Sequence, residues 1–220
     1  GDIYMKIPKI IHQIWLGPKK PPKFMNSWKK NHPEYEYILW DEKRVKTLNM
    51  QLKHLYNLYD NEKSNVWNGR SNLVRIEILY KFGGIYADAD EESLRKLDGD
   101  FMEADLFAAY IHEKESKQIG WGVMGTIPNH PVMRNMIKEL STKKSIEQPS
   151  WKFSGPQLFT KYLEEFGDKG IIILPDYYFY PHLPGKGKNL LGECIREYGD
   201  FKPFGEHYWG STHRDKYGEF

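Results

Sequence analysis

The sequence predicts an α/β fold, with a single Rossmann-like mixed sheet flanked by helices, and three observations support this prediction. Short apolar runs typical of buried strands alternate along the chain with longer segments of helical period. Glycine and proline stand at the ends of many segments, where a strand or helix must stop. With 220 residues, the chain can bury one substantial core. We therefore expect one domain over residues 1–220.

The first strands and helices follow in order from the N-terminus. The run KIIHQIWLG (9–17) is apolar, rich in residues that favour strands, and followed by proline, which predicts a buried first strand. Residues 24–32 have a helical pattern, and YEYILW (35–40) predicts a second strand. From 41 to about 60 the pattern is helical again.

The segment NLVRIEILYKF (72–82) has the 3.6-residue period of a helix, apolar on most of its circumference and stopped by Gly83. Such a helix should be largely buried. Ser71, Asn72 and Arg75 share one side of it, because they are spaced four and three residues apart. A buried helix with one polar patch is expected to face a ligand or a partner charge.

The rest of the chain continues the alternation of strands and helices. Strands are predicted at IYADAD (85–90), ADLFAAY (104–110), WGVMGT (121–126) and GIIILP (170–175), and helices at 130–141 and 155–165.

The composition excludes several classes of protein. Hydrophobic residues make up 40% and charged residues 28% of the chain, which is typical of a globular protein. The 32 basic and 30 acidic residues are too balanced for nucleic-acid binding through bulk charge. Cys194 is the only cysteine, which excludes an intrachain disulfide and favours a cytoplasmic location. No apolar run has the length of a membrane span. We expect translation to begin at Met5, with residues 1–4 as an added remnant.

Lysines cluster in two parts of the chain, and two interpretations remain open. The clusters can be a solvated surface, or they can support peripheral association with the inner membrane face. They comprise Lys19, Lys20, Lys23, Lys29 and Lys30 near the N-terminus and Lys186 and Lys188 in a glycine-rich segment.

The stretch GGIYADADEE (83–92) carries the strongest chemical signal. In an extended strand Tyr86, Asp88 and Asp90 point to one side, and the two carboxylates repel one another unless a cation lies beside them. Hard oxygen ligands favour Mg²⁺ or Mn²⁺. A lone D-x-D is common in loops, but this one ends an apolar strand, where α/β sheets bind ligands.

Two other uses of the D-x-D motif are compared with the sequence. An EF-hand loop beginning at Asp88 would need glycine and glutamate where Ser93 and Gly99 stand, so an EF-hand is excluded. A phosphatase of the D-x-D type remains a weak alternative, because Glu92 holds the position of its threonine or valine and the motif lies deep in the chain.

Several stretches together resemble glycosyltransferase family 32. They are IPKIIHQIWLG, YEYILWDE, RSNLVRIEILYKFGGIYADAD, SGP at 154–156 and FYP at 179–181, and they span positions 7–181. The family includes bacterial polysaccharide enzymes and yeast outer-chain mannosyltransferases, and it is similar to the catalytic core of large clostridial glucosylating toxins. The resemblance implies a GT-A fold, a nucleotide-sugar donor, Mn²⁺ or Mg²⁺, and retention of anomeric configuration.

The resemblance also assigns roles to individual residues. It implies that Asp90 binds the metal directly and that Asp88 reaches the ribose and a metal-bound water. Trp15 matches the aromatic residue that stacks on the base, although a tryptophan at a strand end can also be plain core. The residues expected to bind the donor are Ile14, Trp15, Ser71, Asn72, Arg75, Tyr86 and Asp88. For Arg75, a structural ion pair is the alternative.

The chain departs from the family pattern at two places. The family normally reads S-D-L-x-R where this chain has Asn72, which keeps an acceptor oxygen but loses the charge. In the C-terminal stretch EHYWGSTHR, Thr212 follows Ser211 where the family has tryptophan. By the resemblance, His207 and Ser211 are expected to complete the metal site with Asp88 and Asp90.

The predicted function is a retaining, metal-dependent transfer of a hexose or N-acetylhexosamine in surface polysaccharide synthesis. The donor is a nucleotide-diphosphate sugar, with UDP-sugars favoured and GDP-mannose second, and the acceptor is a saccharide or a lipid-linked saccharide. The expected catalytic residues are Asp88, Asp90, Arg75 and Asn72. The alternatives are a catalytically impaired protein that binds nucleotide sugars through a metal, and the phosphatase.

Overall fold

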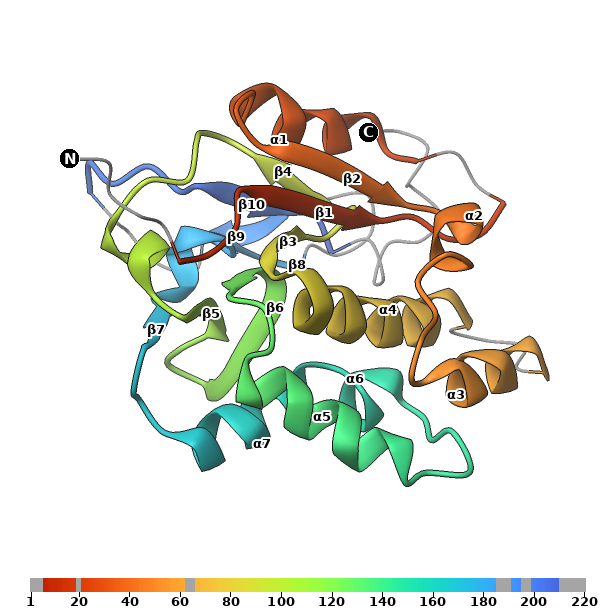
Figure 1. Ribbon diagram of the computed structural model, residues 1–220. Coiled ribbons are helices and arrows are strands. Elements are labelled where there is room, and N and C mark those ends of the chain that lie inside the picture. Colours follow the sequence, from red (N-terminus) through yellow and green to blue (C-terminus); the bar gives the residue numbers. More distant parts are fainter. Residues whose placement is uncertain (1–5, 19–20, 62–65, 185–190, 195–198, 210–220) are drawn as a thin grey trace.

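A mixed six-stranded sheet forms the centre of the molecule (Figure 1). The computed structural model describes residues 6–18, 21–61, 66–184, 191–194 and 199–209. Neighbouring strands pair in the order β2 (Glu36–Trp40), β1 (Ile10–Ile14), β3 (Gly84–Ala87), β6 (Ser116–Thr126), β5 (Leu106–His112) and β7 (Ile171–Leu174). Strand β1 is parallel to β2 and β3, and β5 is parallel to β7, whereas β6 runs antiparallel to both β3 and β5. The predicted mixed α/β sheet is therefore confirmed.

Helices cover one face of this sheet (Figure 1). The central helix α4 (Val66–Phe82) packs against β1 and β3 and begins six residues before the predicted start. Beside it lie α5 (Pro131–Ser141), α6 (Ser150–Phe153) and α7 (Pro156–Phe166).

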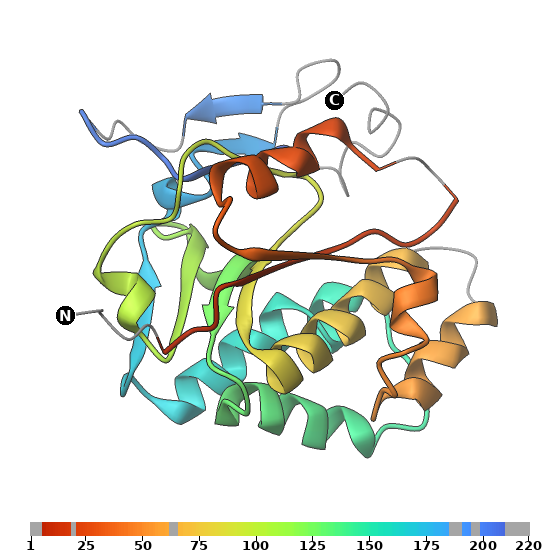
Figure 2. The same cartoon turned by 45° about the horizontal axis from the view of Figure 1, so that its top comes forward.

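The other face carries shorter elements (Figure 2). Helix α1 (Asn26–Asn31) follows a 3-10 turn, η1 (Lys23–Met25), and contacts strand β4 (Glu91–Ser93). Strand β4 pairs antiparallel with β10 (Gly205–His207), and β8 (His182–Pro184) pairs with β9 (Leu191–Cys194). Further 3-10 turns are η3 (Asp100–Glu103) and η4 (Asp176–Tyr178).

Strand β5 shows why its sequence is a continuous apolar run. Leu106 and Ala108 belong to the apolar cluster on the helical face, whereas Phe107 and Ala109 belong to the cluster on the opposite face. All four side chains are completely buried. A strand covered on both faces needs apolar residues at every position rather than at alternate ones.

The segment predicted as one helix from 41 to about 60 is interrupted. It forms α2 (Glu42–Val45) and α3 (Lys53–Leu58), which continues into the 3-10 turn η2 (Tyr59–Asn61). Between α2 and α3, Asn49 adopts a positive φ of 50°, which an α-helix does not allow. The buried carboxylate of Glu77 accepts hydrogen bonds from the amides of Gln51 and Leu52 at this break. The interruption is thus stabilised by a side chain from α4.

The strand predicted at 85–90 is also shorter than expected. Strand β3 ends at Ala87, and residues 89 and 90 form a turn before β4 begins. The amide of Asp88 donates to the carbonyl oxygen of Gly122 at 2.7 Å, and the amide of Glu91 donates back to the carbonyl oxygen of Asp88 at 3.1 Å. Strand alternation therefore explains why the side chains of Tyr86 and Asp88 point to the same side. Asp90 is positioned by a turn rather than by an extended strand.

The helices in the described part of the chain include none with the length and apolar character needed to cross a membrane.

Candidate functional site

A cleft of about 670 Å³ opens where the parallel strands β1 and β3 end. The N-terminal half of α4 and the short helix α6 also line it. Residues from each part of the predicted site meet there, namely Trp15, Ser71, Asn72, Asp88, Asp90 and His207. The carboxyl end of a sheet is the usual ligand position in α/β proteins, so this cleft is the candidate site.

Asp88, Asp90 and His207 form a cluster that can hold a metal ion. Each residue offers one ligand atom, and these atoms all lie within 4.8 Å of one another. His207 Nε2 lies 3.4 Å from Asp90 Oδ2. The three side chains come from two segments that are more than a hundred residues apart in sequence.

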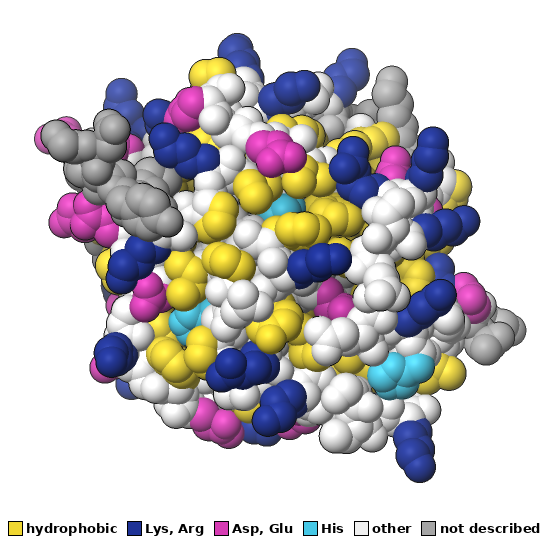
Figure 3. Space-filling view, viewed as in Figure 1, with side chains coloured by type: hydrophobic (Ala, Val, Ile, Leu, Met, Phe, Trp, Pro, Cys, Tyr) yellow, Lys and Arg dark blue, Asp and Glu magenta, His cyan; other side chains and the backbone are white. Residues whose placement is uncertain are grey.

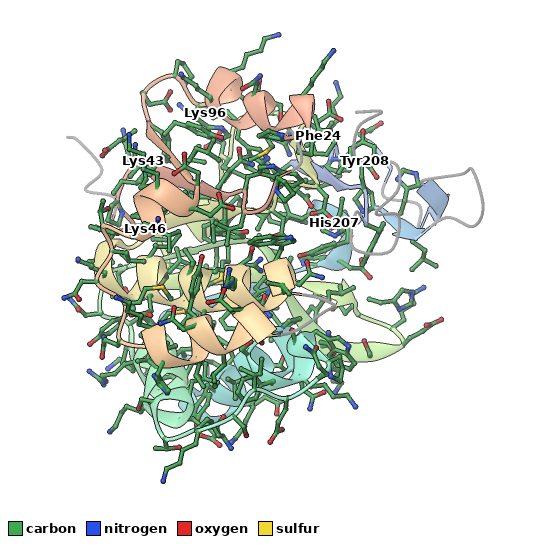
Figure 4. All side chains as sticks on the ribbon, turned by 90° about the vertical axis from the view of Figure 1, so that its right-hand side faces the viewer. Phe24, Lys43, Lys46, Lys96, His207 and Tyr208 are labelled. Carbon is green, nitrogen blue, oxygen red and sulfur yellow. The ribbon has the colours of Figure 1, made fainter. Side chains whose placement is uncertain are left out.

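Backbone pairing brings His207 to the two aspartates. In the register of β4 and β10, His207 lies opposite Glu91, and the amide of Tyr208 donates to the carbonyl oxygen of Asp90 at 2.8 Å. Tyr208 also packs beside Phe24, with ring centroids 5.1 Å apart (Figure 4). The end of β10 is therefore anchored by the pairing of His207 with Glu91 and by the contacts of Tyr208 directly after it.

Glu91 sets the orientation of the His207 ring. Its Oε2 lies 2.8 Å from His207 Nδ1, so Nδ1 carries a proton and donates to the carboxylate, while Nε2 faces Asp90. Burial lowers the pKa of His207, but the carboxylates of Asp90 and Glu91 outweigh it and raise this pKa to about 9. Burial raises the pKa of Glu91 to about 8, although its bond to His207 opposes the rise.

The donor atoms of the cluster fit a divalent cation. Two carboxylate oxygens and one imidazole nitrogen suit Mn²⁺, and a carboxylate on the far nitrogen of a ligating histidine is a common arrangement at metal sites. Glu91 Oε1 is buried and accepts no hydrogen bond from the described residues. A cation between Asp88 and Asp90 would offset the repulsion between their carboxylates.

Arg75 is fixed beside the cluster. Its Nη2 donates to Asp88 Oδ1 at 2.7 Å and to the Tyr86 hydroxyl at 3.1 Å, and its Nη1 donates to the carbonyl oxygen of Trp121 at 3.3 Å. The guanidinium carbon lies 4.2 Å from the ring centroid of Tyr86 and 4.4 Å from that of Trp121. Arg75 therefore forms an ion pair with Asp88 and lines the cleft as well.

Asp88 is held by two neighbours on one of its oxygens. Besides the bond from Arg75, Asp88 Oδ1 accepts a hydrogen bond from the Tyr86 hydroxyl at 2.9 Å. Burial raises the pKa of Asp88, and the charge of Arg75 opposes this rise. Because Oδ1 is engaged by protein groups, Oδ2 is the oxygen directed toward other partners.

Asn72 lies against α6. Its Nδ2 donates to the carbonyl oxygen of Ser150 at 3.3 Å and to Ser154 Oγ at 3.5 Å. The predicted polar patch of Ser71, Asn72 and Arg75 lines the cleft, as its spacing indicated.

Ile14 and Trp15 lie at the end of β1, where both line the cleft, and the amide of Trp15 donates to the carbonyl oxygen of Trp40 at 3.0 Å. Ser211, the other expected metal ligand, lies outside the described residues.

Sequence reasoning missed several residues at this site, among them Glu91, Trp121, Trp67 and Trp151. Glu91 directly follows the D-x-D motif, and Trp121 is the first residue of a predicted strand. These positions are the sequence signals by which the two residues could have been identified. Trp67 and Trp151 line the cleft from segments without a recognisable motif.

Comparison with known proteins connects this site to one family. Residues 18–108 match the family described as the glycosyltransferase sugar-binding region containing a DXD motif. The chain is 34% identical over 138 residues to inositol phosphoceramide mannosyltransferase 3 of Schizosaccharomyces pombe, a match that covers 61% of this chain and 37% of that protein. It is 29% identical to the uncharacterized glycosyltransferase L373 of Acanthamoeba polyphaga mimivirus, over 86% of this chain and 78% of the viral protein.

Solved structures show the same fold. The PaToxG glycosyltransferase superposes with a TM-score of 0.58 at 18% identity, over 73% of this chain and 69% of that one. A glycosyltransferase involved in glycosylation of the major capsid of PBCV-1 superposes with a TM-score of 0.54 at 12% identity, over 97% of this chain and all of that one. The fold is therefore of the GT-A type found in these enzymes. Residues 18–108, which include Asp88 and Asp90, are thus similar to the glycosyltransferase sugar-binding region that contains a DXD motif.

Proposed function

We propose that this chain is the core of a metal-dependent glycosyltransferase. It would transfer a hexose or N-acetylhexosamine, with retention, from a nucleotide-diphosphate sugar to a saccharide. One observation carries the proposal: Asp88, Asp90 and His207 converge beside Arg75 in a cleft at the carboxyl end of the sheet.

Asp90, His207 and Asp88 Oδ2 would hold the metal ion. Bound there, a divalent cation supplies positive charge to a departing diphosphate. Arg75 would add a second, permanent positive charge, and its bonds to Asp88 and Tyr86 hold it in place before any ligand arrives. Groups fixed in advance stabilise developing charge without having to reorganise during the reaction.

The bond changes would occur on one face of the sugar. The bond from the anomeric carbon to the phosphate oxygen breaks, and a bond from the acceptor hydroxyl oxygen to the same carbon forms. The acceptor's proton passes to the departing phosphate oxygen, so no enzyme nucleophile is needed. In this proposal, the chain's residues orient the two substrates and stabilise charge.

The relatives support a mannosyl donor as well as the UDP-sugars that we favour from the sequence. Two of them are named as inositol phosphoceramide mannosyltransferases, and a third as an α-1,4-N-acetylglucosaminyltransferase of Homo sapiens. The chain spans only 37% and 38% of the two mannosyltransferases. We propose UDP-sugars and GDP-mannose as donors, with a saccharide or lipid-linked saccharide as the acceptor in surface polysaccharide synthesis.

A cytoplasmic location and association with the inner membrane face stay predictions. Lys19, Lys20, Lys186 and Lys188 lie outside the described residues. On the face shown in Figure 3, lysine and arginine side chains are scattered among apolar and acidic ones.

The direct test is donor binding and turnover. Thermal unfolding would be followed with UDP-, GDP- and dTDP-sugars, each with and without Mn²⁺, together with release of the nucleoside diphosphate. We expect one donor class to raise the melting temperature, and to do so only with Mn²⁺ present. No shift and no release with any donor would contradict the proposal.

A second candidate function is metal-dependent binding of a nucleotide sugar without turnover. The observation that favours it is Asn72, whose amide is used in holding Ser150. Donor hydrolysis by the natural chain would be compared with hydrolysis by Asn72→Asp. Hydrolysis only by the variant would favour the binding protein, and release of inorganic phosphate from simple phosphoesters would favour the phosphatase.

A further inference from the structure

Two exposed tryptophans line the candidate cleft. Among the described residues, the large apolar side chains that remain exposed are Trp67, Leu94, Trp151 and Phe166. Only the two tryptophans of this set line the cleft. An exposed indole at the opening of a polar site is an apolar surface available to a ligand that enters from solvent.

The two tryptophans have different surroundings. Trp67 packs on the chain itself, since a Cβ built on Gly17 would lie only 3.0 Å from its indole atoms. The guanidinium carbon of Arg70 also lies 5.6 Å from the Trp67 ring. Trp151 is 44% exposed and lines the cleft from α6. Trp151 therefore presents the larger free surface.

The backbone that carries Trp151 is held firmly. Asn72 donates to the carbonyl oxygen of Ser150, and Ser150 is only 5% exposed. Behind Trp151, a Cβ on Gly155 would lie 2.6 Å from Trp151 Cα, so glycine is required for this close approach. An exposed side chain on a fixed backbone loses little freedom when a ligand packs on it.

The neighbours of Trp151 suit a polyhydroxylated ligand. Lys152 Nζ lies 5.2 Å from the centroid of its ring, and Ser71 and the exposed Asn68 line the same cleft. A pyranose ring combines an apolar C–H face with hydroxyl groups around its edge. The indole face of Trp151 can pack on the C–H face, and the polar side chains can form hydrogen bonds with the hydroxyl groups.

We propose that Trp151 is a stacking platform for a sugar ring of the acceptor, and that Asn72 is a positioning residue for it. This inference rests on the proposed transfer reaction. It gives Asn72 a role different from the contact with donor hydroxyls that the family resemblance implies. The donor would occupy the part of the cleft between Trp15 and the Asp88–Asp90–His207 cluster.

The test measures binding of an acceptor-like trisaccharide and hydrolysis of the donor separately. The variants are Trp151→Ala and Trp151→Phe, with Phe166→Ala as a matched control, because Phe166 is 36% exposed and does not line the cleft. Binding of α-mannotriose and maltotriose would be followed by saturation-transfer NMR with Mn²⁺ and UDP or GDP present. Donor hydrolysis without acceptor would be measured in parallel.

We expect at least one trisaccharide to bind the natural chain about tenfold more tightly than Trp151→Ala. The phenylalanine variant should retain most of the binding, and Phe166→Ala should equal the natural chain. Donor hydrolysis without acceptor should fall much less in Trp151→Ala than trisaccharide binding does, and it should stay unchanged in Phe166→Ala. Asn72→Ala should weaken trisaccharide binding while Trp151 is still present.

Two outcomes would contradict the proposed stacking of an acceptor sugar on Trp151. One is equal trisaccharide binding by the natural chain and Trp151→Ala, and the other is donor turnover with no binding of either trisaccharide. Failure of the proposed function gives a different result, because the natural chain would then neither bind nor hydrolyse any donor. Trisaccharide binding that depends on Trp151 would still be detected in that case.

Discussion

At the scale of single residues, Gly122 determines how closely strand β6 approaches the acidic cluster. Its carbonyl oxygen accepts the amide of Asp88, and its own amide donates to the Tyr180 hydroxyl at 3.0 Å. A Cβ at this position would lie 2.9 Å from Asp88 Oδ2 and 2.9 Å from the Tyr180 oxygen. Any side chain here must therefore displace the oxygen that we assign to the metal.

Gly122→Ala should weaken Mn²⁺ binding by about tenfold or more, because the methyl group pushes Asp88 Oδ2 out of the cluster. The comparison is a calorimetric titration of Mn²⁺ into the natural chain and the variant. Thermal unfolding without metal shows how much of the change is general destabilisation. Equal Mn²⁺ affinity in a folded variant would show that Asp88 Oδ2 is not a ligand.

The residue scale also shows where reasoning from sequence succeeds. The spacing of Ser71, Asn72 and Arg75 placed them on one side of a helix, and all three line the cleft. Alternation along a strand paired Tyr86 with Asp88, and their side chains form a hydrogen bond. Both relations are local, so helix and strand geometry alone predicts them. Asp90 lies beyond the strand end, and no periodic pattern marked that turn.

At the scale of elements, His12 joins β1, β2 and the end of α4. The ring is fully buried, with the Trp40 indole nitrogen donating to Nδ1 at 3.0 Å and Nε2 lying 2.9 Å from the carbonyl oxygen of Gly83. An indole N–H can only donate, so Nδ1 is unprotonated and Nε2 carries the proton. Burial lowers the pKa of His12 from 6.5 to about 4, although the bond to Gly83 opposes this.

The free energy of unfolding should fall as pH drops from about 6.5 toward 4. The unfolded chain takes up a proton on His12 near pH 6.5, whereas the folded chain resists it until about pH 4, so acid favours unfolding. The His12 contribution lost across this range is about 3 kcal/mol. Urea unfolding at several pH values measures this loss in the free energy of unfolding, for the natural chain and for His12→Gln. If the variant loses as much stability between pH 6.5 and 4 as the natural chain, His12 is not the cause of the pH dependence.

The pairing of β4 with β10 is the second element-scale feature. It brings His207 to Asp90 from 117 residues further along the chain. The C-terminal motif suggested such a contact only through family resemblance, because neither short strand has a periodic pattern of its own. Long-range pairing of three-residue strands depends on tertiary contacts, which a single sequence does not reveal.

Ligand binding should protect this pair of strands from hydrogen exchange. If His207 helps to hold the metal, Mn²⁺ with a nucleoside diphosphate will slow exchange at the backbone amides of Glu206 to Tyr208. The measurement is exchange followed by mass spectrometry with and without both ligands. Helix α5, which does not line the cleft, is the internal reference. Unchanged exchange in β10 would remove His207 from the proposed ligand set.

At the scale of the whole molecule, the fold positions charge at one end of a mixed sheet. The α/β class followed from alternating segments, and strands β1, β2, β5 and β7 lie within the predicted ranges or close to them. The order of the strands in the sheet could not be predicted from the sequence, because strand pairing is decided by packing between distant segments. The two core clusters on opposite faces of the sheet support the ends of β1 and β3, where the site lies.

The central claim is that Asp88, Asp90 and His207 bind a divalent cation that a glycosyl donor requires. Mn²⁺ binding, followed by its paramagnetic resonance signal with UDP or GDP present, tests this most directly. The natural chain would be compared with Asp90→Ala and with Asp98→Asn, which alters an exposed aspartate outside the cleft.

We predict that Asp90→Ala loses Mn²⁺ binding and lowers glycosyl transfer by at least about 10²-fold. Asp98→Asn should match the natural chain in both measurements. Full Mn²⁺ binding and undiminished transfer by a folded Asp90→Ala protein would contradict the account.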